Sequence, residues 1–407
     1  MKNMKPLLLL LLLVIYACTN SSIKSEIEEI DLRSTLKGFK KGKHLTNLSS
    51  IFSKIEYISL ETDSVNLIST ISKPNVEIKI LGNNIFFNQG EILRFDLKGK
   101  FLNSIGSIGK GPNEYVDSNG FTPYVKGQDT LIGVYSRAQH KFLKYNIKGE
   151  HINNFSVDFW PMDLASLGDN LIFLNYFGNR NPSKYYTFSV LSEQYGKLKR
   201  RLIFKEQEKE TNNDLMMSSL NKLYKYKDTL SYWESNYDTI WRITKDYKTI
   251  PKYYINIGDN KLSISSHTPK IVKDYKKYYS FNNTQVIFET INFIFLKVVY
   301  NKRIYRVFYN KKSKESNIVE FKKPFGRGTS FSFYNDLDGG IPFWPMGNIS
   351  ENKLYMIVYG YEMKDYIARK GNRFNAFDKV GRDKLLKLVE NSKISDNPIL
   401  MVATLKD

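Results

Sequence analysis

The sequence has one cysteine and four histidines among 407 residues, and this scarcity excludes several kinds of site. With Cys18 as the only thiol, the chain has no intramolecular disulfide, no zinc site made of several thiolates and no internal redox pair. The histidines are scattered and show no His-Glu-x-x-His spacing, and a Gly-x-Ser-x-Gly elbow is also missing. We therefore expect no metal site and no cofactor, and no motif fixes a substrate or a reaction.

The N-terminal hydrophobic run is too short to cross a membrane. It spans Leu7–Ile15, nine residues, whereas a membrane-spanning helix needs about 20. Lysines precede this run and the small residue Ala17 follows it, which is the arrangement of a secretory signal. We predict that residues 1–17 are an export signal removed from the mature protein.

The position of the cysteine predicts a lipid anchor. The stretch Val14–Cys18 (VIYAC) resembles the lipobox of bacterial lipoproteins, whose cysteine receives a diacylglycerol and becomes the new N-terminus. The alternative is an ordinary signal peptide with an incidental cysteine. Residues 18–50 start with a polar stretch, and we expect them to form a flexible tether behind the lipidated Cys18. The membrane, reached through this lipid, is thus an expected partner.

Basic residues exceed acidic ones by 61 to 41, a net charge of +20 that becomes +18 without the signal peptide. Such a charge is typical of proteins that bind nucleic acid. An exported, lipid-tethered chain does not meet the genome, however, so we expect no nucleic-acid partner. The charge could instead attract acidic glycans, lipopolysaccharide or the anionic membrane.

A nine-residue segment recurs fifty residues later in the chain. Leu93–Phe101 (LRFDLKGKF) returns as Leu143–His151 (LKYNIKGEH), and each copy predicts two strands joined by a turn with glycine. A second family of turns lies upstream of each such hairpin, as at Gly82–Ile85, so every unit contributes four strands. Six units follow from this spacing, at residues 75–105, 121–157, 162–204, 221–257, 283–321 and 344–405.

Units of four antiparallel strands in 40 to 50 residues are typical of propeller blades. We predict an all-β fold, a six-bladed β-propeller over residues 51–407. The sixth unit has only three obvious strands, so we expect the N-terminal strand Ile55–Leu60 to complete the last blade and close the ring. Helical spacing of apolar residues after Asp378 predicts a helical insertion in that blade, at about residues 362–395.

Several motifs together resemble a known family. They are Ile55–Thr62 (IEYISLET), Gly106–Tyr115 (GSIGKGPNEY) and Asn397–Leu400 (NPIL), with the lipobox before them. The chain resembles the six-bladed β-propeller lipoproteins of Bacteroidota, and more distantly the NHL-type propellers. The resemblance implies the fold and a place in the cell envelope. It implies no particular activity, because NHL-type propellers mostly bind partners or ligands and only occasionally catalyse.

The tetrapeptide Phe-Trp-Pro-Met occurs twice, at residues 159–162 and 343–346, where the third and the sixth units begin. Blades three apart lie across the axis of a six-bladed ring, so Trp160 and Trp344 could face each other over the central funnel. Two facing indoles suit a sugar, a peptide or an aromatic group. The alternative is that each tryptophan fills the junction between two blades.

The loops around the funnel supply the other candidate ligand residues, because binding residues concentrate on loops of a rigid scaffold. The loop Gly106–Tyr115 lacks the Gly-Lys-Ser/Thr ending of a phosphate loop. Its candidates are Lys110, Glu114 and Tyr115, with a tight turn packed by the tyrosine as the alternative. Two further loops at residues 176–183 and 322–346 add Arg180 and Arg327.

The leading functional hypothesis is a non-catalytic ligand-binding or protein-interaction scaffold in the cell envelope, with a glycan, peptide or envelope protein as its partner. The alternative is an enzyme, a lyase or hydrolase that acts on a peptide or glycan at the funnel. Residues 19–22 directly after the cysteine include no acidic residue, which favours the periplasmic side of the outer membrane over the cell surface.

Overall fold

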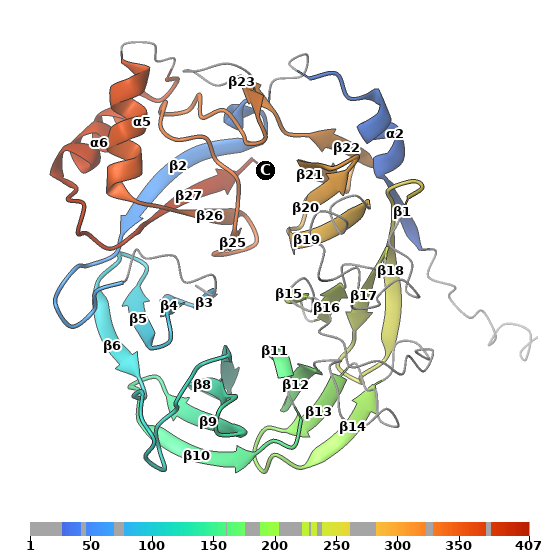
Figure 1. Ribbon diagram of the computed structural model, residues 1–407, viewed down its shortest axis with the longest axis vertical. Coiled ribbons are helices and arrows are strands. Elements are labelled where there is room, and N and C mark those ends of the chain that lie inside the picture. The colour runs from blue at the N-terminus through green and yellow to red at the C-terminus, as the bar shows by residue number, and fades with distance from the viewer. Residues whose placement is uncertain are drawn as a thin grey trace, which may run out of the picture.

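The computed structural model describes residues 27–41, 46–68, 77–159, 161–175, 188–202, 222–227, 229–233, 238–260, 282–322, 329–371 and 376–406. Six antiparallel sheets are arranged in a ring like the blades of a propeller (Figure 1). This confirms the predicted fold class. The first strand of each blade lies nearest the axis, and the fourth lies at the rim.

The blades follow one another along the chain. Blade 1 contains β3 (Glu77–Leu81), β4 (Asn84–Asn88), β5 (Ile92–Asp96) and β6 (Phe101–Ile105). Blade 2 contains β7 (Gly120–Lys126), β8 (Asp129–Ser136), β9 (Lys141–Asn146) and β10 (His151–Ser156). Blade 3 contains β11 (Pro161–Leu167), β12 (Asn170–Asn175), β13 (Phe188–Ser192) and β14 (Leu198–Leu202).

The other three blades are similar. Blade 4 contains β15 (Lys222–Tyr226), β16 (Thr229–Trp233), β17 (Thr239–Ile243) and β18 (Thr249–Asn256). Blade 5 contains β19 (Asn283–Glu289), β20 (Phe293–Tyr300), β21 (Arg303–Asn310) and β22 (Glu315–Ile318). Blade 6 contains β25 (Gly347–Asn348), β26 (Lys353–Val358), β27 (Ile399–Leu405) and β2 (Phe52–Ser59). A small hairpin of β23 (Phe321–Lys322) and β24 (Thr329–Ser330) precedes blade 6.

Blade 6 closes the ring with strands from both ends of the chain. The strand β2 pairs antiparallel with β27, from Phe52 opposite Leu405 to Ser59 opposite Ile399. The N-terminal strand therefore completes the last blade, as the sequence predicts. Backbone groups that would form an open sheet edge are paired in this way.

The expected tether is partly folded, which corrects the prediction for residues 18–50. The strand β1 (Glu28–Asp31) pairs parallel with β18 and adds a fifth strand to blade 4. Helix α2 (Leu32–Gly38) follows, capped by Asp31, and η1 (Leu48–Ser50) leads into β2. Ile30 and Leu32 are fully buried between blades 4 and 5, and this burial holds the segment on the propeller. Residues 1–26 lie outside the described part.

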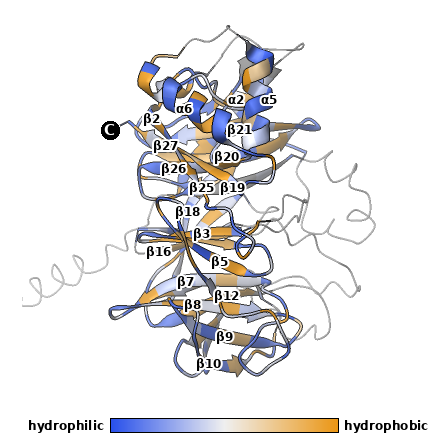
Figure 2. Ribbon diagram, turned by 90° about the vertical axis from the view of Figure 1, so that its left-hand side faces the viewer, coloured by the Kyte–Doolittle hydropathy of each residue, from blue (hydrophilic) through white to orange (hydrophobic). Residues whose placement is uncertain are grey.

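The helical insertion of blade 6 consists of α5 (Gly360–Lys370) and α6 (Lys379–Asn391), which lie together at one end of the side view (Figure 2). Asp378 caps α6 by accepting a hydrogen bond from the Gly381 amide at 2.8 Å. Leu385 and Val389 are buried one turn apart, as the spacing predicts. No helix of the described residues is long and apolar enough to cross a membrane.

The core is divided among the junctions between neighbouring blades. Six separate apolar clusters fill the six junctions, and each takes side chains from two adjacent sheets. Aromatic rings are prominent in them, for example Phe142 stacked on Phe155 at 4.9 Å and Phe188 edge-on to Tyr232 at 4.8 Å. Much of the aromatic content of the sequence is thus structural.

The repeated glycines serve the contact between blades. Gly99 and Gly149 have φ of 87° and 85°, and a Cβ on them would lie 1.9 Å from the Ser59 carbonyl oxygen and 2.3 Å from that of Ser104. Both oxygens belong to the preceding blade. This close approach explains why the nine-residue repeat keeps its glycine.

The propeller has two distinct faces. We call the side with the turns between the first and second and between the third and fourth strands the hairpin face, and the opposite side, with α5 and α6, the loop face. The strand β18 starts at a hairpin-face turn, and β1 runs parallel to it. Glu28, at the start of β1, pairs with Lys314 in a hairpin-face turn at 2.7 Å. The N-terminal end of β1 therefore lies at the hairpin face.

Candidate functional site

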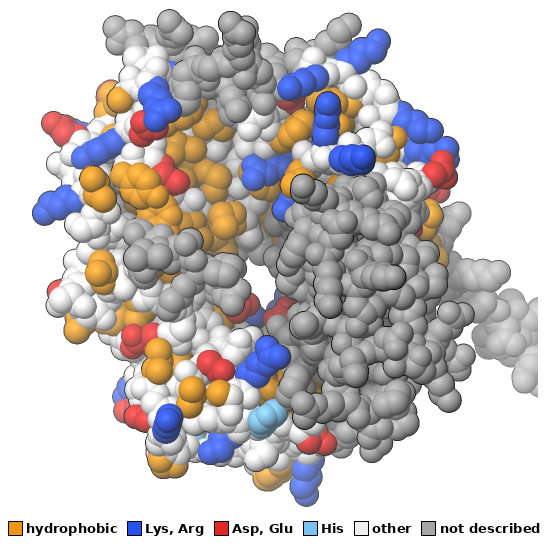
Figure 3. Space-filling model, in the orientation of Figure 1, with side chains coloured by type: hydrophobic (Ala, Val, Ile, Leu, Met, Phe, Trp, Pro, Cys, Tyr) orange, Lys and Arg blue, Asp and Glu red, His pale blue; other side chains and the backbone are white. Residues whose placement is uncertain are grey.

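The central opening is the first candidate site, because the inner strands bring charged side chains together there. The space-filling view shows the opening, with acidic and basic side chains at its edge (Figure 3). Lys79 on β3 donates a hydrogen bond to the Phe121 carbonyl oxygen of blade 2 at 2.6 Å. Its amine also pairs with Glu77 at 3.0 Å and with Asp163 of blade 3 at 3.6 Å. One lysine thus links three blades.

Burial disfavours the charge of Lys79, but Glu77 and Asp163 outweigh this effect, and the pKa of Lys79 lies above its usual value. The amine is therefore a fixed cation. It cannot act as a general base at neutral pH, and it can orient a polar ligand that enters the opening.

A second amine lies on the inner strand of blade 4. Lys225 on β15 donates a hydrogen bond to the Ser166 hydroxyl of β11 at 2.9 Å. Although its side chain is accessible, the surrounding protein lowers the pKa of Lys225, and nearby Lys79 lowers it further. An amine with a lowered pKa beside a serine hydroxyl is an arrangement that can activate the serine as a nucleophile. Ser166 itself is buried, with 6% exposed.

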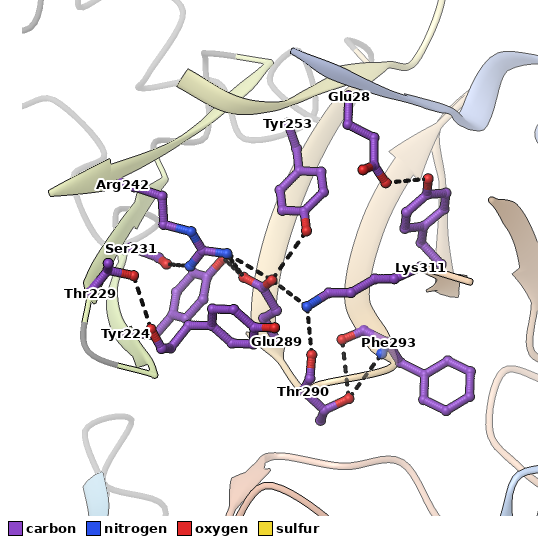
Figure 4. A network of polar contacts seen from close by, with 12 residues as sticks. Glu28, Tyr224, Thr229, Ser231, Arg242, Tyr253, Glu289, Thr290, Phe293 and Lys311 are labelled. Atoms are coloured by element: carbon purple, nitrogen blue, oxygen red, sulfur yellow. Dashed lines mark hydrogen bonds and ion pairs between the residues drawn. The ribbon is translucent and has the colours of Figure 1, made fainter. Parts of the chain in front are cut away.

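Two blade junctions contain a buried glutamate surrounded by cations. Between blades 4 and 5, Glu289 accepts two hydrogen bonds from Arg242 at 2.7 and 2.8 Å and pairs with Lys311 at 2.5 Å (Figure 4). The hydroxyls of Tyr224 and Tyr253 each donate to it at 3.3 Å. This cluster holds two cations and one carboxylate away from water, and it fixes one blade to the next.

The junction of blades 2 and 3 has a related cluster. Glu193 pairs with Lys144 at 2.6 Å and with Lys126, and the Tyr124 hydroxyl donates to it at 2.8 Å. Burial opposes the charge of Glu193, but these three hydrogen bonds outweigh burial and lower its pKa. Lys144 and Arg242 occupy the same position of the third strand, so the internal repeat supplies one basic residue to each of these two junctions.

Trp344 lies in the core and not across the funnel. Its ring stacks on Phe333 at 6.1 Å and meets Phe295 edge-on at 5.8 Å, and only 4% of the residue is exposed. It fills the junction of blades 5 and 6, which is the alternative that the sequence left open. Its ring face is therefore not available to a ligand.

The loop Gly106–Tyr115 is a self-contained turn. Tyr115 is fully buried, and its hydroxyl donates to the Ile105 carbonyl oxygen at 2.9 Å and accepts from the Ile92 amide at 3.2 Å. Glu114 accepts from the Gly111 amide at 2.8 Å. The structure thus shows the alternative, a tight turn packed by Tyr115, and the Glu114 carboxylate binds the backbone of its own loop. Lys110 is exposed at the tip of the loop.

Several predicted residues lie outside the described residues. They are Cys18 with the signal peptide, Trp160, Arg180 and Arg327. A turn with two aspartates at residues 335–340 could suggest a cation site, but protein groups occupy its acceptors: Asp338 accepts from the Tyr57 hydroxyl at 2.9 Å and from the Gly340 amide at 2.9 Å. Within the described ranges, no group of three or more His, Cys, Asp or Glu side chains could hold a metal.

Sequence reasoning missed Lys79, Asp163 and Lys225 on the inner strands. The only signal for such residues was the period of two within each strand, which places alternate residues on opposite faces. The basic residue of the third strand is visible in the repeat, as Arg94 and Lys144, but the repeat does not show what its side chain binds.

The fold defines the protein as a six-bladed β-propeller. The chain belongs to a family described as a domain of unknown function (DUF4934), whose model matches residues 28–404. No curated protein matches the sequence.

Two solved structures with similar folds come from Bacteroides. One, from Bacteroides fragilis and provisionally described as an exported protein, is 18% identical, with a TM-score of 0.67 over 93% of this chain and 100% of the other. The second, a member of the DUF4221 family from Bacteroides vulgatus, is 13% identical, with a TM-score of 0.48 over 87% of this chain and 97% of the other. At 18% identity the first match supports the propeller fold alone.

Proposed function

We propose that this protein is a lipid-anchored propeller of the cell envelope, on the periplasmic side of the outer membrane, that binds a ligand or a protein partner on its loop face without catalysis. The observation that carries the proposal is the direction of β1. Because β1 runs from the hairpin face toward the loop face, a lipid on Cys18 would hold the hairpin face against the membrane. The loop face with the central opening then points away and is free to bind.

The charge of the hairpin face supports this orientation. The turns between the third and fourth strands of blades 1 to 5 carry eight exposed lysines and two exposed acidic residues. The lysines are Lys98, Lys100, Lys148, Lys197, Lys245, Lys248, Lys312 and Lys314. Basic groups near an anionic membrane surface each contribute about 1 kcal/mol of attraction.

The test uses the single natural cysteine. Once Cys18 is lipidated, an introduced cysteine is the only free thiol. We expect a bulky maleimide to label Ala138→Cys on the loop face faster than Lys148→Cys on the hairpin face when the protein is bound to membranes. The same variants with Cys18→Ser should stay soluble and be labelled at equal rates. Two results would contradict the proposal. One is equal labelling of the two membrane-bound variants, and the other is the absence of a membrane-bound fraction for the chain that keeps Cys18.

The alternative, an enzyme at the central opening, is favoured by the Ser166 and Lys225 pair. A fluorophosphonate probe that labels the wild-type chain, and labels neither Ser166→Ala nor Lys225→Met, would establish a reactive serine and overturn a purely non-catalytic role. An unlabelled wild-type chain would remove the one observation in favour of this alternative.

A further inference from the structure

Two basic side chains lie opposite each other in the junction of blades 5 and 6. Lys297 on β20 and Arg306 on β21 are directly paired in the sheet register, so both side chains project from the same face. It is the face that carries Phe295 and Phe308 into the core between these blades. Like charges directly opposite one another destabilise a sheet, so this pair is unfavourable without a compensating group.

Among the described residues, no carboxylate neutralises this pair. One nitrogen of Arg306, Nη1, donates to the Phe331 carbonyl oxygen at 2.9 Å and to the Ser332 hydroxyl at 2.7 Å. The amine of Lys297 has no hydrogen bond and no ion pair within the described part of the chain. Burial lowers the pKa of both groups, and Arg306 further lowers that of Lys297.

The other charged junctions show the contrast. Glu193 and Glu289 each occupy the place where two cations meet, and they supply the acceptors that the cations need. In the junction of blades 5 and 6 the described acceptors of Arg306, the Phe331 carbonyl oxygen and the Ser332 hydroxyl, are uncharged, and further donors lie beside them. The Arg306 guanidinium lies over the Trp344 ring, 5.3 Å from its centroid, and the indole Nε1 is buried with no hydrogen-bond partner. The site thus presents donors and positive charge, and it calls for an acceptor with negative charge.

We propose that Lys297 and Arg306 form a binding site for an oxyanion group, a carboxylate, phosphate or sulfate, of a ligand that enters the junction of blades 5 and 6. Both side chains are partly exposed, so such a group can reach them. The guanidinium fork, through the nitrogens that are not bound to Phe331 and Ser332, and the Lys297 amine would contact it together. This inference deepens the proposed function, because it names the class of ligand.

The test uses the unlipidated chain, which starts at residue 18 and carries Cys18→Ser. Its thermal unfolding is measured in sodium sulfate, phosphate, acetate or glucuronate and compared with unfolding in sodium chloride at equal ionic strength. Without added oxyanion, Lys297→Met should unfold at a higher temperature than the parent chain, because it removes an uncompensated charge. We expect at least one anion to stabilise the parent chain saturably. The affinity for this anion should fall about 10-fold or more in Lys297→Met and in Arg306→Met, because each variant loses a hydrogen bond between charged groups and the binding energy that it contributes.

Lys312→Gln is the matched control, because it removes one exposed lysine from the same blade. It should keep the saturable response of the parent chain, whereas a general salt effect would be the same in all variants. A response to acetate or glucuronate assigns a carboxylate ligand, and a response to phosphate or sulfate assigns a phosphorylated or sulfated one. The proposal is overturned if no anion distinguishes the parent chain from Lys297→Met, or if Lys297→Met is the less stable of the two. Neither outcome depends on the lipid anchor.

Discussion

Replacing Glu289 by glutamine should destabilise the protein strongly, because Glu289 is the only carboxylate bound to Arg242 and Lys311 in the described cluster. Their side chains are 8% and 13% exposed, and that of Glu289 is fully buried. Removing one partner of a buried ion pair costs about 3–5 kcal/mol. Glu289→Gln leaves two buried cations without a carboxylate, so its cost should lie at the upper end of this range. A loss of about 4 kcal/mol lowers the folding equilibrium constant about 1000-fold.

The assay is urea unfolding followed by tryptophan fluorescence. Trp233 is buried in the apolar cluster between blades 4 and 5, so its fluorescence reports on this junction. The control Glu315→Gln removes an exposed carboxylate from the same blade and should change stability by less than about 0.5 kcal/mol.

A double variant tests the reasoning itself. Arg242→Met with Glu289→Gln leaves one buried cation in place of two, so it should be more stable than Glu289→Gln alone. If the two substitutions are additive, or if Glu289→Gln costs less than about 1 kcal/mol, an uncompensated charge is not the cause of the loss and the argument is refuted.

Three further outcomes follow from the structure. Burial, and then Arg382, lower the pKa of Lys370 to about 8 from 10.5. Above pH 8 the unfolded chain therefore binds more protons than the folded chain, and the free energy of unfolding should rise by about 2 kcal/mol between pH 8 and pH 9.5. Urea unfolding of Lys370→Met should not show this rise, and a pH dependence equal to that of the wild type would contradict the prediction. Gly82→Ala, at φ 55° with open space around the new Cβ, should lower the free energy of unfolding by about 1–2 kcal/mol. Gly99→Ala should lower it clearly more, because its Cβ would meet a backbone oxygen. Equal urea midpoints for the two variants would count against that contact. Ile30→Ala should cost about 2–5 kcal/mol in the same assay, whereas Ile27→Ala, at a site 47% exposed, should cost little, and a harmless Ile30→Ala would mean that β1 contributes nothing to stability.

The blades could be predicted because their signals are local. Each hairpin depends on a few residues, such as Asp96 to Lys100, where the Asp96 carboxylate accepts two turn amides and Gly99 takes the left-handed conformation. The stray strand Ile55–Leu60 also had one evident place, because the last blade lacked a strand.

The rest depends on contacts between distant segments. The strand β1 lies in a polar stretch, and its pairing with β18 joins residues more than 200 positions apart. The surroundings of Trp344 and Lys79 could not be predicted from the sequence either. The period of two within a strand separates its two faces, but it does not tell whether a side chain lies toward the axis or toward the next blade. Among the site residues, the charged pairs formed across blades could not be found from spacing.

The parallel pairing of β1 also has a mechanical consequence. A force applied to the chain before Glu28 acts along the axis of β1, toward the hairpin face. The hydrogen bonds between β1 and β18 would therefore be loaded in shear, so that they are all stretched together and are not broken one after another. The same pull reaches blade 4 and bypasses the β2 and β27 pair that closes the ring. If Cys18 carries the proposed lipid, a force on that anchor would load β1 and β18 and leave the closing pair of strands unloaded.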